Sequence, residues 1–138
     1  MNQKNKIANK LRSSKLRPTK QRKKIADFLF NREKTFHFTA DELNKIINKK
    51  DNLEKISLAT IYNTIGAFKK AGHLKEILTN DNKSFYDTNV SYHHHFFDIE
   101  TNELEDINYN DIKVEKLPHA PKGKKIQQVE VTLTVKKS

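Results

Sequence analysis

Cysteine is absent from this chain of 138 residues. Disulfide bonds, thiol nucleophiles, Cys-ligated iron–sulfur clusters and Cys-bound structural zinc are therefore excluded. The three glycines form no Gly-rich phosphate-binding loop. Apolar runs are short as well: none approaches the roughly 18–20 residues of a membrane-spanning helix, and no signal-peptide core follows the N-terminal lysines. We therefore expect a cytoplasmic protein with no membrane partner.

The charge of the chain is high and unevenly distributed. The formal net charge is +10 and the isoelectric point is about 9.7. Residues 1–80 hold 19 Lys or Arg and 7 Asp or Glu, whereas residues 81–138 hold 8 and 10. A basic excess confined to the first part favours binding of nucleic acid or an acidic surface there, and a different task for the second part. The alternative is a protein that is simply rich in surface lysines.

The first helical segment follows a clear boundary. Residues 1–14 are polar and Lys-rich, which fits a frayed helix or an extended arm. Pro18 disfavours helix at the residue before it, and Thr19 can cap a helix over residues 20–31. The apolar face of that helix comprises Ile25, Phe28 and Leu29.

Two further helices are predicted before residue 73. Thr39 and Glu42 form a capping-box pattern at the start of one. Ser57 can cap the other, which Gly72 ends. The inward residues of this third helix recur at helical spacing. They are Leu58, Ile61, Ile65 and Phe68.

Short strands follow the helices. Residues 74–78 and 83–87 read as a hairpin around the turn-rich residues 79–82. Three helices and a hairpin are the order of a winged helix-turn-helix, which we assign to residues 1–88. The second part, residues 89–138, reads as β: the predicted strands cover 92–100 and 103–107, around the turn Thr101-Asn102, and 126–135. The segment between the last two strands is broken by Pro118, Pro121 and Gly123. The expected fold class is α+β.

The third helix presents an outward face suited to DNA. Tyr62 can contact a thymine methyl group, and Asn63 can pair with adenine or a phosphate. Ser57 and Thr60, near the helix N-terminus, suit phosphate. The alternative is that Tyr62 is a partly buried core aromatic residue and that each lysine is a solvated surface charge. The remaining outward residues are Ala59, Gly66 and Lys70, and the candidates for backbone or minor-groove contacts are Arg17, Lys20, Arg22 and Lys23.

Three consecutive histidines are the most unusual feature of the chain. On a strand, His93 and His95 share one face and His94 lies on the other. Two imidazoles at this spacing can bind Fe, Zn, Co or Ni, added carboxylates extend the range to Mn, and an imidazole can also ligate haem iron. The alternative is a chance polar run. His37 can complete a site if the two parts fold together; His73 and His119 are expected at the surface. Carboxylates nearby in sequence are Asp87, Asp98, Glu100 and Asp106.

No catalytic constellation is present, because no nucleophile motif surrounds the serines and histidines. We therefore expect no enzyme. A metal-storage or metal-dependent hydrolytic protein with an incidental basic face remains a hypothesis, and it predicts no sequence-selective DNA binding.

Four segments, in order, resemble the ferric uptake regulator (Fur) family: Leu16–Arg22, Thr39–Leu43, Ser57–Thr64 and His93–His95. The resemblance runs from about Leu16 to Val135. Within the family the chain is most similar to the iron response regulator (Irr) branch of alphaproteobacteria. The features of that likeness are Tyr62-Asn63-Thr64, the run from His93 to Phe97, the missing Cys pairs and the Val-rich last strand.

The resemblance implies an N-terminal winged helix, a C-terminal α/β dimerisation domain, and a homodimer bound to AT-rich palindromic double-stranded DNA. It places Tyr62 in the major groove. The residues that it places near the DNA backbone are Arg17, Thr19 and Arg22. The regulatory metal ligands that it implies are His37, Asp87, His93, His95 and Asp106. Many members have Glu in place of the two Asp, and Asp at both positions is also similar to the family's peroxide-sensing branch. The likeness to Irr further implies haem at His93, His94 and His95.

The chain departs from the family pattern at several positions. The Cys-x-x-Cys pairs that bind structural zinc in many members are missing. Val129 stands where a second metal site has a His, and Asn63 stands where an Arg is common. Prolines interrupt the usual dimerisation helix over residues 109–123.

Two functional hypotheses follow from the resemblance. The first is a regulator of iron and haem homeostasis of Irr type, whose DNA binding is lowered by haem. The alternative is a Fur-type repressor activated by Fe(II) or Mn(II), with Zn also suited to the site. In both, a ligand that bridges the two parts shifts DNA affinity only through its differential affinity for two arrangements of them.

Overall fold

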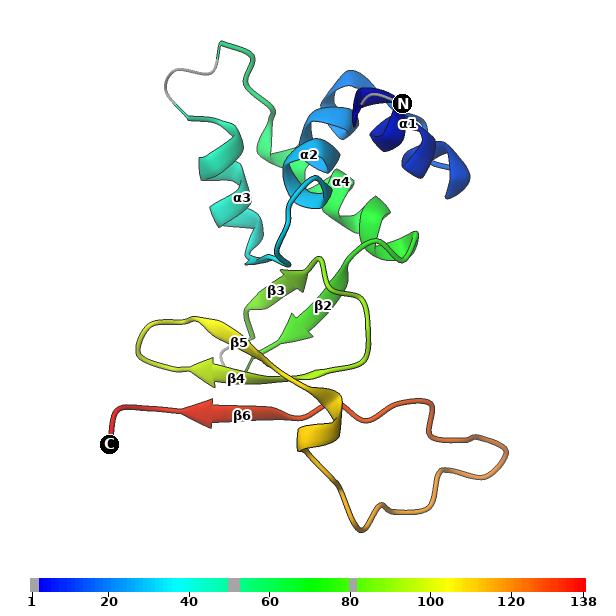
Figure 1. Ribbon diagram of the computed structural model, residues 1–138, viewed down its shortest axis with the longest axis vertical. Coiled ribbons are helices and arrows are strands. Elements are labelled where there is room, and N and C mark those ends of the chain that lie inside the picture. The colour runs from blue at the N-terminus through cyan, green and yellow to red at the C-terminus, as the bar shows by residue number, and fades with distance from the viewer. Residues whose placement is uncertain (1–2, 50–52, 80–81) are drawn as a thin grey trace. The chain divides into compact units, whose positions relative to one another are not determined.

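The computed structural model describes residues 3–49, 53–79 and 82–138. The chain forms two compact units, Met1–Val90 and Ser91–Ser138. Helices are gathered in the first unit and each unit contains a small sheet, so the fold is α+β as expected (Figure 1). No helix among the described residues has the length and apolarity needed to cross a bilayer.

The first unit combines helices with an antiparallel sheet. Its helices are α1 (Gln3–Ser13), α2 (Lys20–Phe30), α3 (Ala40–Ile47) and α4 (Leu58–Lys70). Its strands, in the spatial order β1-β3-β2, are β1 (His37–Phe38), β3 (Ser84–Asp87) and β2 (Lys75–Leu78). The expected hairpin is confirmed: β2 pairs with β3 from Lys75↔Asp87 to Leu78↔Ser84. Of the expected turn, Asn80 and Asp81 lie outside the described residues.

Helix α1 packs on the unit and is no extended arm. Its buried side chains, Ile7, Ala8 and Leu11, lie on one face. The helix ends at a left-handed residue, Lys15 with φ +64°, so that the Leu16 N–H reaches the Leu11 carbonyl at 2.8 Å. This is the hydrogen-bond pattern of a Schellman end, formed without glycine.

The expected helix starts and stops are confirmed. Thr19 and Ser57 each accept a hydrogen bond from the backbone N–H three residues later, and Thr39 forms a capping box with Glu42. Gly72, with φ +84°, ends α4 and lets the His73 N–H reach back to a carbonyl of the last turn. These contacts satisfy backbone groups that helix ends otherwise leave unpaired.

The core of the first unit lies between its helices. Buried residues on α2, α3 and α4 include Ile25, Leu29, Leu43, Ile61, Ile65 and Phe68. Leu58, expected to point inward, is 44% exposed, whereas Thr64 is 3% exposed. The expectation for Leu58 is wrong because this residue opens α4, one turn before the part of the helix that packs on the core.

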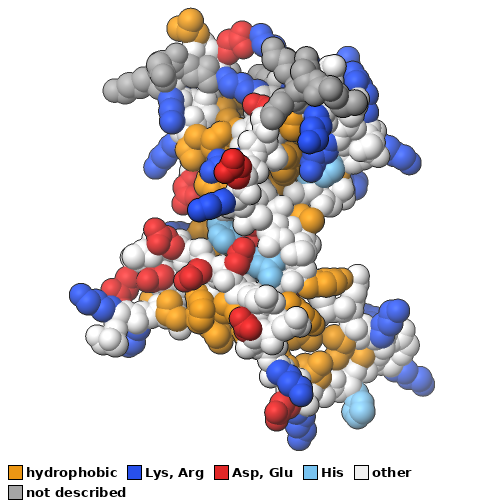
Figure 2. All heavy atoms as spheres, in the orientation of Figure 1, with side chains coloured by type: hydrophobic (Ala, Val, Ile, Leu, Met, Phe, Trp, Pro, Cys, Tyr) orange, Lys and Arg blue, Asp and Glu red, His pale blue; other side chains and the backbone are white. Residues whose placement is uncertain are grey.

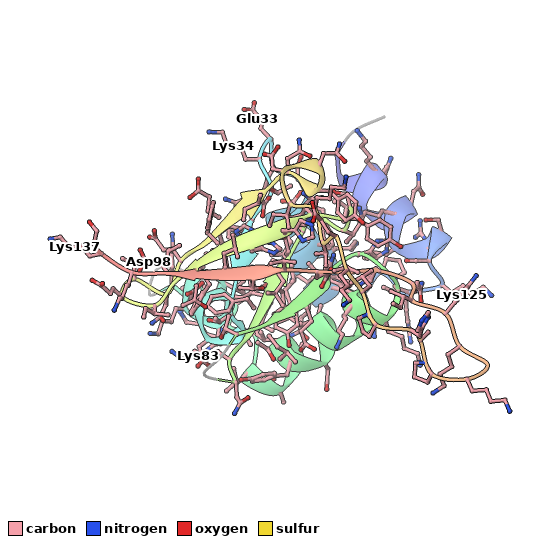
Figure 3. The ribbon with its side chains drawn as sticks, turned by 90° about the horizontal axis from the view of Figure 1, so that it is seen from below. Glu33, Lys34, Lys83, Asp98, Lys125 and Lys137 are labelled. Carbon is pink, nitrogen blue, oxygen red and sulfur yellow. The ribbon has the colours of Figure 1, made fainter. Side chains whose placement is uncertain are left out.

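The second unit is built on a three-stranded sheet in the order β5-β4-β6. Strand β5 (Leu104–Ile107) is antiparallel to β4 (His94–Asp98), and β6 (Thr132–Val135) is parallel to it. Asp98 and Lys137 lie beside the same end of β6, as parallel pairing requires (Figure 3). The turn between β4 and β5 places Asn102 at φ +60°.

The long segment before β6 is irregular. A single 3₁₀ turn, Tyr109–Asp111, follows β5, and residues 112–131 contain no further helix or strand. The strand expected over 126–135 is therefore only four residues long. Pro118 and Pro121 cannot donate backbone hydrogen bonds and interrupt helix, which explains why no helix forms here.

Candidate metal centre and nucleic-acid interface

The first unit contains a His–Asp pair. His37 on β1 and Asp87 on β3 are cross-strand partners, and His37 Nε2 lies 3.0 Å from Asp87 Oδ2. Asp87 is fully buried, and the Asn89 N–H donates to its other oxygen at 2.8 Å. Burial of a carboxylate costs folding free energy unless the carboxylate faces a cation or hydrogen-bond donors. Asp87 therefore depends on its contacts with His37 and the Asn89 N–H.

The second unit contains a set of two histidines and one aspartate. His95 on β4 is the cross-strand partner of Asp106 on β5, and its Nε2 lies 3.2 Å from Asp106 Oδ1. His93 Nε2 lies 3.3 Å from the same oxygen. The centroids of the two imidazole rings are 4.4 Å apart. The expectation that His93 and His95 share a face is confirmed, and both Nε2 atoms converge on one carboxylate oxygen.

The orientation of His93 suits it to bind a metal. Its Nδ1 lies 2.7 Å from the Ser91 carbonyl oxygen, which can only accept, so Nδ1 carries the proton. In the neutral ring Nε2 then presents a lone pair toward Asp106, and two acceptors face each other. A proton or a cation must lie between them. Two imidazole nitrogens and a carboxylate oxygen fit a transition-metal ion, and a hydrogen bond that fixes the other ring nitrogen is typical of metal-bound histidines.

His94 is separated from its two neighbours. Its ring stacks on Tyr109, with centroids 5.1 Å apart and planes at 14°. The Val131 N–H donates to His94 Nδ1 at 2.9 Å. This bond fixes the proton of the neutral ring on Nε2, so Nε2 has no lone pair for a metal unless the Val131 bond is given up. The structure therefore does not bring the three histidines together on one face.

The other carboxylates near the histidines in sequence are used in a turn. Asp98 Oδ1 accepts the backbone N–H groups of Glu100 and Thr101, and Glu100 accepts the Lys137 N–H. These contacts stabilise the end of β4 that lies away from His93.

The outward face of α4 is exposed as expected. Tyr62 is 50% exposed and belongs neither to the core cluster nor to the side chains packed against it, which argues against a core role. Asn63 is exposed as well. Ser57 Oγ donates to Thr60 Oγ1 at 2.9 Å, so the two hydroxyls lie together at the helix start. The other residues expected to face outward, Ala59, Gly66 and Lys70, are also exposed.

The start of α2 carries the expected basic residues. Arg17 is exposed, and Arg22 Nη1 donates to the Arg17 carbonyl at 3.2 Å, which ties the two residues together. Thr19 uses its side-chain oxygen to cap α2. Separate Lys and Arg side chains are visible on this face of the molecule (Figure 2).

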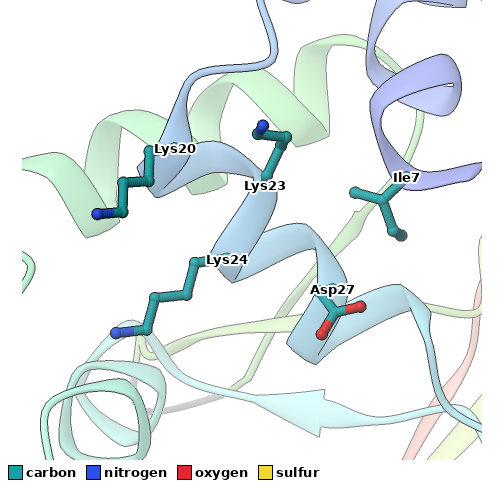
Figure 4. Close-up of a pocket in the computed structure, with 5 residues that line it drawn as sticks. All are labelled: Ile7, Lys20, Lys23, Lys24 and Asp27. Atoms are coloured by element: carbon teal, nitrogen blue, oxygen red, sulfur yellow. The ribbon is translucent and has the colours of Figure 1, made fainter. Parts of the chain in front are cut away.

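A basic cavity of about 280 Å³ lies beside α2, and sequence reasoning did not identify one of its lysines. Lys20, Lys23 and Lys24 extend from α2 around it, and α1 contributes Ile7 (Figure 4). Lys20 Nζ lies 2.8 Å from a Glu54 carboxylate oxygen, and this hydrogen bond lowers the pKa of Glu54. Lys24 is the missed residue. Its spacing of four from Lys20, which puts both on one helix face, is the signal that identifies it.

The expectation for His73 is wrong. This residue is half-buried, its ring packs against Phe30 and Phe68, and its Nε2 lies 2.8 Å from Ser14 Oγ. Burial, with a smaller contribution from the charge of Lys10, lowers the pKa of His73. No local pattern predicts this burial, because Phe30 and Ser14 come from segments distant in the sequence.

Known proteins share this sequence and fold. The model of the ferric uptake regulator family matches residues 13–135. The peroxide-responsive repressor PerR of Staphylococcus epidermidis is 34% identical over 108 residues, which are 78% of this chain and 69% of the relative. The ferric uptake regulator of Pseudomonas aeruginosa, solved with manganese, has a TM-score of 0.69 at 22% identity and covers 94% of this chain and 96% of its own.

The ferric uptake regulator of Vibrio cholerae also has a TM-score of 0.69, at 19% identity, over 94% of this chain and 98% of its own. These two structures are similar in fold, and the family model and PerR add similarity in sequence. The likeness to the Irr branch stays a prediction. The chain belongs to the ferric uptake regulator family, a family of metal-responsive transcription regulators and not of enzymes.

Proposed function

We propose that this protein is a DNA-binding repressor whose affinity for an AT-rich palindromic duplex is raised by one divalent metal ion. The observation that carries the proposal is the convergence of His93 Nε2 and His95 Nε2 on Asp106 Oδ1, at 3.3 and 3.2 Å. The complete ligand set that we propose is His37, Asp87, His93, His95 and Asp106.

Ligand number supports a metal shared by the two units. The first unit offers one imidazole and one carboxylate, and the second offers two imidazoles and one carboxylate. Neither set reaches the four to six donors that protein sites for such ions usually supply. The two sets are joined by residues 88–92 only. We propose that together they hold one ion, and that the ion favours the arrangement of units in which a dimer can contact both half-sites of its operator.

The donor types indicate which ions fit. Imidazole nitrogen suits Fe(II) and Zn(II), and two carboxylates add affinity for Mn(II). The P. aeruginosa relative was solved with manganese, in agreement with this choice. We propose Fe(II) or Mn(II) as the co-repressor, with Zn(II) as a competitor.

The DNA contacts that we propose come from α4 and the start of α2. Tyr62 and Asn63 would contact base edges, because they lie on the exposed face of α4. Arg17, Thr19, Arg22, Ser57 and Thr60 would contact phosphates.

We propose that the second unit forms the homodimer. Strand β6 is at an edge of its sheet, and its four residues are all exposed. Leu133 is 41% exposed and Val135 37%. An exposed edge strand with apolar residues is a surface that pairs with another chain. Sedimentation of the Leu133→Lys variant tests this: it should be monomeric at concentrations where the unaltered chain is dimeric, and an unchanged dimer would place the interface elsewhere.

A peroxide response is the second candidate function, because the relative with 34% identity is a peroxide-responsive repressor. Both acidic metal ligands of this chain are Asp, which is the pattern expected of that branch. If the response exists, hydrogen peroxide should abolish DNA binding of the Fe(II)-loaded protein and leave the Mn(II)-loaded protein unchanged. Equal resistance of both forms would exclude it.

Haem regulation through His93, His94 and His95 stays a prediction of the likeness to Irr. The bond from the Val131 N–H to His94 disfavours His94 as an iron ligand. Haem is therefore one arm of the deciding experiment, and the His93/His94/His95 triple alanine variant shows whether haem uses the cluster.

The deciding experiment is fluorescence anisotropy of a labelled AT-rich palindromic duplex at one fixed salt concentration. The protein is titrated metal-free, with Mn(II) and with haem. We expect Mn(II) to raise DNA affinity by at least about tenfold, a coupling within the usual range. The His95→Ala variant should lose this gain, and the matched His119→Ala variant should keep it because His119 is exposed and outside the ligand set.

Two outcomes contradict the proposal. Tight metal-free binding that haem abolishes would favour the Irr-type function. DNA affinity that neither Mn(II) nor haem changes, and that the Tyr62→Ala variant retains, would show that the protein is not a sequence-selective regulator.

A further inference from the structure

The second unit contains a cavity of about 360 Å³ on the face of β4 opposite the proposed metal ligands. Because side chains alternate along a strand, His94 points to this face while His93 and His95 point to the other. The cavity volume falls within the range of about 300–1,000 Å³ for small-molecule sites. Apolar side chains are visible at the surface of this unit (Figure 2).

The wall of the cavity is largely apolar. It includes Tyr109, Val114, Leu117 and Val129. The side chains of Tyr109, Val114 and Leu117 stay 44%, 41% and 45% exposed. These residues come from the irregular segment that follows β5, so apolar surface is left open that a ligand with an apolar body would cover.

A buried polar group faces this apolar wall. His94 is 2% exposed and lines the cavity. Its Nδ1 accepts from the Val131 N–H, so the neutral ring carries its proton on Nε2. Nε2 has no hydrogen-bond partner among the described residues. An acceptor on a ligand in the cavity would pair with this N–H.

The donors around the cavity indicate the chemistry of the ligand. In this tautomer His94 Nε2–H donates and has no lone pair for a metal, so an acceptor group suits this position better than a cation does. Lys113 is the one charged residue among those lining the cavity, and the Asn110 amide adds a further donor. We propose that this cavity binds a small organic carboxylate, with the carboxylate at His94 and Lys113 and an apolar body against Val114, Leu117 and Val129.

The test uses hexanoate as the probe and 1-hexanol as its neutral counterpart. Amide chemical shifts of the full-length, metal-free protein are followed during each titration. We expect hexanoate to saturate, with the largest change at the Val131 N–H, and hexanol to bind at least about tenfold more weakly, because a charged acceptor strengthens the hydrogen bonds. Since no metal is added, failure of this proposal is distinct from failure of the proposed metal response.

Matched variants locate the site. Lys113→Glu should weaken hexanoate binding at least about tenfold, while Lys116→Glu, an equal charge change three residues away and outside the cavity lining, should change it little. Val129→Phe should fill the cavity and abolish binding. Equal binding of hexanol, no saturation by hexanoate, or an unaffected Lys113→Glu variant would overturn the proposal. The proposal would also be overturned if the chemical shifts of these amides changed with protein concentration and not with probe concentration. A second copy of the chain would then cover the cavity.

Discussion

Hydrogen bonds to the backbone decide what each histidine of the cluster can do. Ser91 accepts from His93 Nδ1 and so turns the lone pair of His93 toward Asp106, whereas Val131 donates to His94 Nδ1 and so leaves a proton on Nε2. Three identical side chains in a row thereby obtain two opposite roles. At the residue scale, Asp106 Oδ1 is the oxygen that both His93 Nε2 and His95 Nε2 face.

Replacement of Asp106 by Asn keeps the shape of the side chain and removes its charge. We expect the Asp106→Asn variant to bind Mn(II) at least about tenfold more weakly, because the charged oxygen that both imidazoles face is lost. Calorimetric titration measures this. The control is Glu105→Gln, on the same strand with an exposed side chain, which should bind as the unaltered chain does.

His73 makes the stability of the first unit depend on pH. Its pKa is lowered from 6.5, so the unfolded chain binds this proton more tightly than the folded chain. The stability that neutral His73 supports is therefore present above pH 6.5 and is lost as the pH falls below it toward the lowered folded value. Urea unfolding of metal-free protein between about pH 7.5 and 5.5 should show a weaker fall for His73→Phe than for the unaltered chain. An equal fall would show that other groups cause it; His119→Gln serves as the exposed control.

At the element scale, α1 packs on the first unit through the buried side chains of Ile7, Ala8 and Leu11. Leu11 is fully buried, and the left-handed Lys15 turns the chain back so that α2 can pack against α1. A short isolated helix is marginal in water, so α1 depends on this packing for its stability.

Truncation of Leu11 tests the packing of α1. The Leu11→Ala variant should lose about 2–5 kcal/mol of unfolding free energy, the range for buried large-to-small changes. Lys6→Ala, an exposed position of the same helix, should change stability little. Denaturant titration compares the two. A loss of less than about 1 kcal/mol would mean that α1 is detached in solution.

At the scale of the whole molecule, the basic charge is confined to the part that carries α2 and α4, and the proposed metal ligands are divided between the two units. A ligand held by both units would couple DNA binding in one to metal binding in the other, because its affinity would depend on both. A shared metal ion is such a ligand.

Sharing can be measured with a double-mutant cycle. If one ion is bound by both sets, His37→Ala and His95→Ala should each remove most of the Mn(II) affinity, and the double variant should lose far less than the sum. The stoichiometry should be one ion per chain. Additive losses, or a second equivalent of metal, would show that each unit binds its own ion.

The sequence by itself determined α2, α3 and α4, because Thr19, Thr39, Ser57 and Gly72 act through hydrogen bonds to residues close by in the chain. It also determined the shared face of His93 and His95, which follows from the period of a strand. Family membership could be recognised for the same reason, since its motifs are local strings.

Only the tertiary structure decided which groups separated in sequence meet. The pairing of β4 with β5 brings Asp106 to the two histidines, and the parallel strand β6 brings the Val131 N–H to His94. The neighbours that other elements supply also decided that Leu58 is exposed and that His73 is half-buried. The irregular segment over residues 112–131 forms its cavity only because β6 returns beside β4, and no local pattern encodes that return.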